Sequence, residues 1–289
     1  MSGLRKRVWT WLLAALAAQA SACKSSSTRT PNWSSSGDAL GQRVRDGQVP
    51  SLHHLRFSSK ILQREVGAVV ATPPEYEQRT VQRYPVVYIF AGIGADEWTY
   101  LRDVTLDNPA VRTLFKDPER AAILVFANPA DSAGAERAQA VLADELVREV
   151  DEHYRTRRHP SARSLEGFSL GGVTALNLYL HRPDVFGQVV ALSSACYLLP
   201  TCQALRATLM QTAQRTQRPR VMLAVGGSEI AQNRVVSDEL APVFGTVVET
   251  IDGADHNWAA LLKAPLRSIP LGQRIAEFHT RGFASVEAP

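Results

Sequence analysis

Short apolar runs recur along residues 50–251, and polar segments long enough to form helices separate most of them. The first two runs, His54–Ser58 and Val66–Val70, end at Pro73-Pro74, so we expect two antiparallel strands there. The later runs are almost continuously apolar, which is typical of strands buried on both faces of a parallel sheet. They are Tyr84–Phe90, Ala121–Phe126, the less apolar run entering Gly167, Gln188–Leu192, Arg220–Val225 and Thr246–Ile251. The pattern predicts one α/β domain with a mostly parallel central sheet and an antiparallel beginning.

Two of the intervening segments carry apolar residues at helical spacing. The first stripe consists of Leu142, Leu146, Val150 and Tyr154. Four charged residues of the same segment fall outside this stripe: Glu145, Arg148, Glu149 and Glu152. The second stripe, Val173, Leu176 and Leu180, ends near Pro183, which cannot continue a helix. We expect two helices here, the first of them covering one face of the sheet.

The segment Gly167-Phe168-Ser169-Leu170-Gly171-Gly172 lies where a predicted strand runs into the second predicted helix. A serine between two glycines at such a junction is typical of a nucleophile elbow, since the sharp turn brings backbones so close that a Cβ at either glycine would clash. The serine hydroxyl is then exposed at a helix N-terminus. The short pattern also occurs in ordinary loops, but its strand-to-helix context favours the α/β-hydrolase fold.

A nucleophilic serine needs a base within hydrogen-bond reach, and the base needs an acceptor that holds its tautomer. In α/β-hydrolases the order along the chain is serine, acid, histidine. Of the seven histidines, only His256 and His279 follow a plausible acid loop. His256 comes in a turn-forming stretch after the last predicted strand, whereas His279 lies in a charged terminal segment. We therefore predict that His256 is the base.

The best candidate for the acid is Glu229, which follows a predicted strand and the turn Gly226-Gly227-Ser228. Asp252 and Asp255 are closer to His256 in sequence, but the side chains of neighbouring residues usually diverge. The alternative for Glu229 is a carboxylate at a helix start, which the helix dipole favours.

Two backbone amides are predicted to bind the oxyanion of the tetrahedral intermediate. The N–H of Leu170, directly after the nucleophile, is the first, and the N–H of Ile93 in Ala91-Gly92-Ile93-Gly94 is the second. The alternative for Ile93 is a glycine-rich turn without a catalytic role. Trp98 and Trp258 either line a substrate pocket or simply pack, and the sequence leaves both interpretations open.

An ordered set of motifs over roughly residues 50–280 resembles the esterase D family, which includes S-formylglutathione hydrolases, feruloyl esterases, enterochelin-type esterases and the antigen 85 mycolyltransferases. The motifs are Tyr88-Ile89-Phe90-Ala91-Gly92-Ile93-Gly94 with Trp98, Leu142-Ala143-Asp144-Glu145-Leu146, Asp151-Glu152-His153-Tyr154-Arg155-Thr156, Gly167–Gly172, Gly227-Ser228-Glu229 and Asp255-His256-Asn257-Trp258. The resemblance implies a triad of Ser169, Glu229 and His256, helices on both faces of the sheet, and little or no lid. It implies a carboxylic ester as the substrate of an acyl-enzyme mechanism that uses no cofactor.

Two positions depart from the family pattern. Many members have His-Gly where this chain has Ala91-Gly92, and the usual acid is Asp where this chain has Glu229. These departures motivate one alternative, a catalytically silent surface protein that uses the fold for binding. The second alternative is an acyltransferase, in which an alcohol replaces water.

The N-terminus has the pattern of a cleaved export signal. Arg5-Lys6-Arg7 precedes the apolar run Val8–Ala18, which is shorter than the roughly 20 residues that span a bilayer. Ala20-Ser21-Ala22 suits an ordinary signal peptidase, whereas Cys23 directly after it suits bacterial lipidation, which we favour. We expect an export signal in residues 1–22, a polar tether in residues 23–48 that anchors the protein to the cell envelope, and a catalytic domain in residues 49–289.

Removing residues 1–22 takes away three cations and no anion, so the formal charge falls from +4 to +1. Nucleic acid is therefore not an expected partner. With Cys23 lipidated, Cys196 and Cys202 remain, and in an oxidising compartment we expect them to form a local disulfide; two reduced thiols are the alternative. No second pair of ligands stands at the spacing of a zinc site, so no metal is expected.

Overall fold

The computed structural model describes residues 51–92, 94–103, 109–116, 118, 121–127, 135–194, 220–226, 248–251, 256–266 and 269–284. All of them belong to one compact unit, Ser36–Pro289. The export signal and tether predicted for residues 1–48, including Cys23, lie outside the described residues. Within the described ranges, every helix is too short or too polar to cross a membrane.

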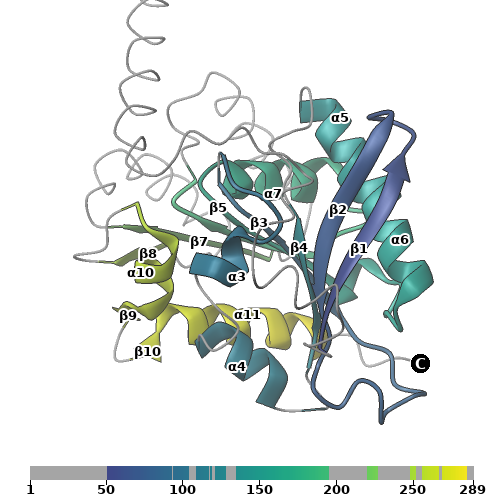
Figure 1. Ribbon diagram of the computed structural model, residues 1–289. Coiled ribbons are helices and arrows are strands. Elements are labelled where there is room, and N and C mark those ends of the chain that lie inside the picture. Colours follow the sequence, from purple (N-terminus) through teal and green to yellow (C-terminus); the bar gives the residue numbers. More distant parts are fainter. Residues whose placement is uncertain are drawn as a thin grey trace, which may run out of the picture. The chain divides into compact units, whose positions relative to one another are not determined.

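The described strands form a central sheet of eight, in the order β1-β2-β4-β3-β5-β6-β7-β8 (Figure 1). They are β1 (Leu52–Ser59), β2 (Arg64–Ala71), β3 (Val86–Phe90), β4 (Ile123–Ala127), β5 (Arg163–Phe168), β6 (Gln188–Leu192), β7 (Val221–Gly226) and β8 (Val248–Ile251). Within this sheet β2 pairs antiparallel with both β1 and β4, and all the other pairings are parallel. The α/β-hydrolase fold and the antiparallel opening predicted from the sequence are therefore confirmed.

The apolar runs form strands because the sheet is covered on both faces. All residues of β3, β4, β5 and β6 are buried. Alternate residues face different cores: Val86, Tyr88 and Phe90 pack on one side of β3, while Val87 and Ile89 pack on the other. Several strands start later than the sequence predicts. Tyr84, for example, makes an isolated bridge to Thr156 before β3 begins.

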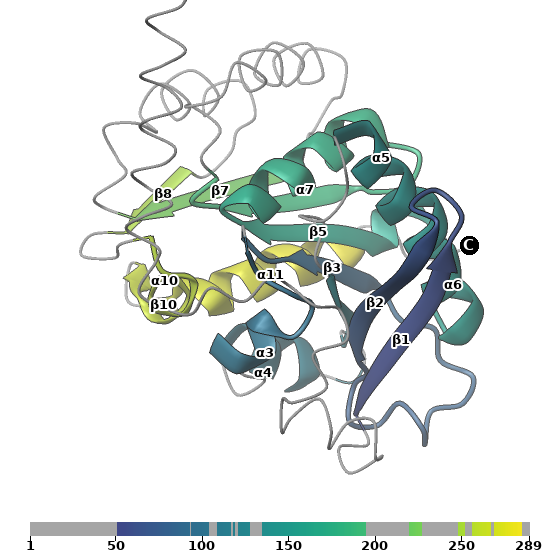
Figure 2. The same ribbon diagram turned by 45° about the horizontal axis from the view of Figure 1, so that its top comes forward.

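Helices cover both faces of the sheet, and Figure 2 shows α7 on one side and α11 on the other. One side carries α5 (Ala135–Ala140), the π-helical segment η1 (Val141–Leu146), α6 (Val147–His153) and α7 (Leu170–His181). The other side carries α3 (Thr99–Asp103), α4 (Pro109–Lys116), α10 (Trp258–Lys263) and α11 (Leu271–Ala284). The 3-10 turn η2 (Pro160–Ala162) and the small hairpin of β9 (Pro265–Leu266) and β10 (Ile269–Pro270) complete the described elements.

Glu145 departs from the simple helical pattern. Leu142, Leu146 and Val150 are in the core as predicted, yet Glu145 is buried as well. Its carboxylate accepts hydrogen bonds from Ser59 Oγ at 2.5 Å and from the backbone N–H groups of Lys60 and Ile61 at 2.9 and 3.3 Å. The π-helical turn changes the angular spacing of side chains, and this places Glu145 against the β1–β2 turn.

Candidate active site

Ser169 occupies a sharp turn between β5 and α7. Its backbone has φ 56° and ψ −120°, a conformation that costs free energy for a residue with a side chain. The Ser169 N–H donates to the carbonyl of Leu192 on β6 at 2.9 Å, and its carbonyl accepts from Val173 N–H at 3.2 Å. These bonds and the flanking strand and helix hold the strained turn, which is the geometry expected of a nucleophile elbow.

The glycines around Ser169 are required by close backbone approaches. A Cβ added to Gly167 would lie 2.1 Å from the carbonyl oxygen of Gly171, and one added to Gly171 would lie 2.3 Å from the carbonyl oxygen of Phe90. Neither separation is possible between non-bonded heavy atoms. The spacing of glycines in the sequence therefore reports the packing of α7 onto β5 and β3.

His256 contacts Ser169 although the two residues are 87 positions apart in the sequence. Its Nε2 lies 3.0 Å from Ser169 Oγ, and its imidazole is exposed. The residue directly precedes Asn257, whose side chain caps α10 by accepting a hydrogen bond from Ala260 N–H at 2.9 Å. The start of α10 thus fixes the backbone beside His256. The structure brings together these two of the predicted site residues.

An aromatic cluster supports the histidine. Phe168, the residue before the nucleophile, lies against the His256 ring with centroids 4.7 Å apart, and it stacks on Trp258 at 5.5 Å with planes 9° apart. Tyr100 meets Trp258 edge to face at 4.6 Å. Trp258 is 6% exposed and Trp98 is 5% exposed. The contacts described for both tryptophans are packing contacts, and a role in substrate binding stays a prediction.

The two predicted oxyanion donors differ in what the structure describes. Leu170 is the first residue of α7, where a backbone N–H has no acceptor within the helix. Ile93 lies outside the described residues, but its neighbour Gly92 lies against the nucleophile. A Cβ on Gly92 would come within 3.3 Å of Ser169 Cβ. The loop after β3 therefore begins beside the serine, at Gly92.

The predicted acid Glu229 lies outside the described residues, and so do Cys196 and Cys202. The strand before Glu229, β7, ends at Gly226 and is parallel to β6 and β5. The chain thus leaves β7 at the same edge of the sheet at which Ser169 follows β5. The acid and the disulfide stay predictions.

His279, the alternative base considered from the sequence, lies in the interior. Its Nδ1 is 2.6 Å from Ser164 Oγ, and its Nε2 is 3.2 Å from Glu166 Oε2, all three residues being fully buried. Ser164, Glu166 and Phe168 share the face of β5 that α11 covers. The two polar residues on this face explain why this strand is the least apolar. The hydroxyl, imidazole and carboxylate are sealed from any substrate, so this group joins α11 to the sheet.

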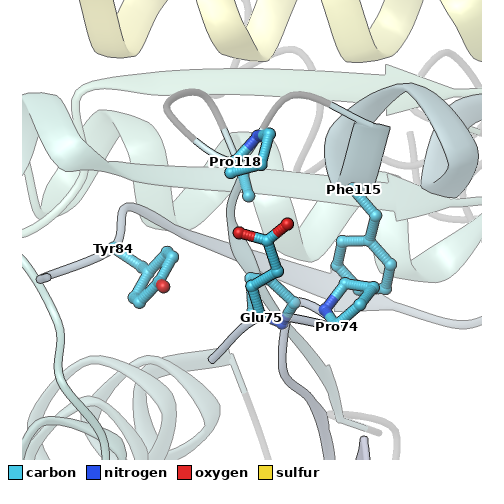
Figure 3. Close-up of a pocket in the computed structure, with 7 residues that line it drawn as sticks. Pro74, Glu75, Tyr84, Phe115 and Pro118 are labelled. Carbon is cyan, nitrogen blue, oxygen red and sulfur yellow. The ribbon is translucent and has the colours of Figure 1, made fainter. Parts of the chain in front are cut away.

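A small cavity of about 60 Å³ lies at the opposite edge of the sheet (Figure 3). It is lined by Pro73, Pro74, Glu75, Tyr84, Phe115, Pro118 and Ala121. Tyr84 and Ala121 precede β3 and β4, whereas Ser169 follows the end of β5. The cavity has room for a few water molecules and does not belong to the site around Ser169.

The groups around Ser169 are a hydroxyl, an imidazole and backbone amides at a helix N-terminus. Across the described ranges, no three His, Cys, Asp or Glu side chains gather in a way that could hold a metal ion. A hydroxyl in contact with an imidazole can attack an electrophilic carbon while the imidazole takes its proton.

Solved structures share this architecture. FphF, a fluorophosphonate-binding serine hydrolase of Staphylococcus aureus, superimposes with a TM-score of 0.62 at 17% identity, over 80% of this chain and 98% of that one. The ferulic acid esterase AmCE1/Fae1A of Anaeromyces mucronatus, solved with ferulic acid, gives a TM-score of 0.58 at 18% identity, over 82% of this chain and 92% of that one. At these identities the likeness shows the fold.

A curated relative provides the sequence match. Esterase Rv1288 of Mycobacterium tuberculosis is 29% identical over 149 residues, which cover 48% of this chain and 32% of that protein. The chain thus matches about a third of the length of this relative. In addition, the family model described as "Putative esterase" matches residues 59–246. This match spans more than half of the chain, and the chain therefore belongs to this esterase family.

Proposed function

We propose that the protein is a serine carboxylesterase in which Ser169 attacks an ester carbonyl and His256 transfers the proton. One observation carries this proposal: His256 Nε2 lies 3.0 Å from the hydroxyl of a serine held in a strained strand-to-helix turn. A serine hydroxyl becomes an effective nucleophile only when a base accepts its proton, and this distance is within hydrogen-bond reach. Membership of the esterase family supports the same chemistry.

The reaction proceeds in two halves. The Ser169 hydroxyl gives its proton to His256 Nε2 as its oxygen bonds to the carbonyl carbon, and the carbonyl oxygen takes the negative charge. The bond to the alcohol oxygen then breaks, and His256 returns the proton so that the alcohol leaves. Water attacks the acyl-enzyme with His256 again as the base, which releases the carboxylic acid and restores Ser169.

The remaining site residues take roles that the sequence assigns. The N–H groups of Leu170 and Ile93 donate to the carbonyl oxygen as it becomes negative. Glu229 accepts a hydrogen bond from the Nδ1–H of His256, which leaves Nε2 free to receive the serine proton, and its carboxylate stabilises the imidazolium. Glu can take the place of the usual Asp because the carboxylate group is the same and only one methylene is added.

For the substrate we propose a carboxylic ester with a short acyl chain. Structural neighbours include esterases named for ferulic acid and S-formylglutathione hydrolases, so related sites accept different acyl groups. Hydrolysis rates of acetyl, octanoyl and feruloyl esters of one alcohol test the proposal. The acetyl ester is expected to be cleaved fastest. A preference for the octanoyl or feruloyl ester would contradict the proposal of a short acyl chain.

Residues 1–48 support the proposal that the protein is exported and anchored by a lipid at Cys23 in the bacterial envelope. Replacement of Cys23 by Ser is expected to release the protein from membranes into the soluble fraction. An unchanged distribution would contradict lipidation. We also propose the Cys196–Cys202 disulfide, which predicts that alkylation of the exported protein modifies neither thiol until a reductant is added.

A fluorophosphonate probe tests the catalytic proposal directly, since it forms a stable bond only with an activated serine. We expect labelling of the wild type, no labelling of Ser169→Ala, and retained labelling of Ser164→Ala, whose hydroxyl contacts the buried His279. Circular dichroism verifies that each variant is folded. Absence of labelling in folded wild type, or equal labelling of Ser169→Ala, would overturn the proposal and favour a binding protein.

A further inference from the structure

A second polar pair lies close to the site. His54 on β1 and Glu97, in the loop between β3 and α3, are 43 residues apart, and His54 Nε2 lies 3.1 Å from Glu97 Oε1. The two side chains are only 9% and 3% exposed. Neither residue belongs to the triad, and neither contacts Ser169. The pair joins the loop that follows β3 to the antiparallel edge of the sheet.

Gly67 on β2 provides the space that this pair occupies. A Cβ added to Gly67 would lie 2.8 Å from Glu97 Oε1 and 2.9 Å from His54 Nε2. Trp98 packs edge to face against the His54 ring, with centroids 4.9 Å apart. The Glu97 carboxylate and the His54 imidazole thus fit in a space that exists because Gly67 has no side chain, and Trp98 packs against the imidazole.

The pair is buried, but two of its polar atoms lack a hydrogen-bond partner among the described residues. Among the described residues, neither His54 Nδ1 nor Glu97 Oε2 has a hydrogen-bond partner. Apolar side chains of similar volume at such positions are commonly as stabilising as a buried ion pair, or more so. Local violations of this kind are expected where function, rather than stability, determines the residue.

The loop that Glu97 holds is short and touches the nucleophile at its other end. Gly92 lies against Ser169, and Ala95 N–H donates to the Gly92 carbonyl at 3.4 Å. Asp96 then closes the loop, since its carboxylate accepts from Trp98 N–H at 3.0 Å and from Thr99 Oγ at 2.9 Å. Glu97 thus lies five residues along the chain from Gly92, the backbone that packs beside Ser169.

We propose that Glu97, paired with His54 above Gly67, is a positioning residue that fixes the loop after β3 so that its backbone amide meets the developing oxyanion. This inference rests on the proposed esterase function. Donors to an oxyanion act mainly in the transition state, and their effect depends on fixed geometry. Loosening this loop therefore lowers kcat and leaves KM nearly unchanged.

The main test compares four variants of the full chain with p-nitrophenyl acetate as substrate. Glu97→Leu keeps the volume but loses the carboxylate, and we expect kcat to fall about 10- to 100-fold with KM within about twofold. Glu97→Gln keeps an oxygen that can accept from His54, and it is expected to retain most of kcat. His54→Leu is expected to resemble Glu97→Leu, and the double variant to lose no more than either single variant.

A phenylboronic acid provides a readout that a merely structural role would not change. It forms a tetrahedral adduct with Ser169, so its affinity should fall in parallel with kcat/KM in Glu97→Leu. Gly67→Ala supplies an independent test, since its methyl group displaces the carboxylate and is expected to lower kcat in the same way. It decides the outcome if Glu97→Leu fails to fold.

Glu145→Gln is the matched control, because Glu145 is a buried carboxylate whose hydrogen bonds go to the β1–β2 turn and not to the loop after β3. We expect it to alter the unfolding temperature and leave kcat unchanged. Retained kcat in folded Glu97→Leu and Gly67→Ala, or a raised KM alone, would overturn the positioning role while Ser169-dependent hydrolysis stands. Activity that persists in Ser169→Ala would instead overturn the proposed function, and the positioning role with it.

Discussion

The ring of Phe168 lies against the imidazole of His256, with centroids 4.7 Å apart and planes inclined by 37°. The same phenylalanine stacks on Trp258, the first residue of the helix that begins after His256. The residue before the nucleophile thus packs on both the histidine and its supporting helix. The apolar side chain that precedes Ser169 in the chain thus supports the imidazole that contacts the Ser169 hydroxyl.

Phe168→Leu is expected to lower kcat about tenfold, because small displacements of a catalytic group have large effects on rate. KM should change little, since Phe168 is buried and the change affects the orientation of His256. Steady-state kinetics with p-nitrophenyl acetate measure both constants. Phe126→Leu is the control, since Phe126 contacts Tyr100 in the same core and not His256. Equal losses of kcat in the two variants would contradict the role of Phe168.

Gly171→Ala is expected to destabilise the fold by about 3 kcal/mol or more, because severe overpacking forces the backbone to move. The added methyl group would lie 2.3 Å from the Phe90 carbonyl oxygen. Gly94→Ala is the comparison: its φ is +74°, yet an added Cβ meets no atom within 4 Å. Backbone strain alone should cost about 1–2 kcal/mol there. Urea unfolding monitored by tryptophan fluorescence measures both, and similar losses would contradict the steric argument.

The strands and the elbow could be predicted from the sequence because their signals are local. A buried parallel strand is a continuous apolar run, and the glycines of the elbow are required by close approaches between backbones. The sheet and the position of Ser169 could therefore both be predicted. His256 was found because chain order and the last strand restricted the choice of histidine. The predictions for Ile93 and Glu229 stay untested, since both residues lie outside the described ranges.

The buried polar pairs could not be predicted because their partners are distant in sequence. Glu145 has the helical spacing of an exposed residue, and only the π-helical turn directs it inward. No local sequence pattern relates His54 to Glu97. The need for glycine at position 67 becomes visible only in the folded structure, where β1, β2 and the loop after β3 meet. His279 stands in a charged segment, and only the packing of α11 shows its burial.

Tyr88→Phe is expected to stabilise the protein by about 1 kcal/mol at neutral pH, because removing an unsatisfied buried hydroxyl removes a desolvation cost. Tyr88 is buried in the core, and its Oη has no hydrogen-bond partner among the described residues. Tyr76→Phe is the control, since the Tyr76 hydroxyl accepts a hydrogen bond from Arg155 N–H at 2.9 Å and its loss should destabilise. Thermal unfolding of both variants measures the difference, and a destabilised Tyr88→Phe would contradict the prediction.

The same tyrosine predicts a dependence of stability on alkaline pH. Burial raises the pKa of Tyr88 far above its usual value, and the nearby Asp151 raises this pKa further. The phenol stays protonated in the folded state while the unfolded chain ionises at about pH 10. Above about pH 10 this ionisation stabilises only the unfolded chain, so the free energy of unfolding of the wild type falls as the pH rises further. The advantage of Tyr88→Phe over the wild type should therefore grow between about pH 9 and 11. A constant difference across this range would contradict the assignment.

His279→Leu is expected to reduce the free energy of unfolding by about 3–5 kcal/mol, because it leaves the Glu166 carboxylate buried without its partner. It also removes the contact of Ser164 Oγ, 2.6 Å from the ring. The double variant His279→Leu with Glu166→Leu should be more stable than His279→Leu alone, since no unpaired charge remains in the interior. His153→Leu, at an exposed position of α6, should change stability by no more than about 0.5 kcal/mol. Urea unfolding of the wild type, His279→Leu, Glu166→Leu and the double variant gives the coupling free energy. Additive losses would show that the two side chains act independently.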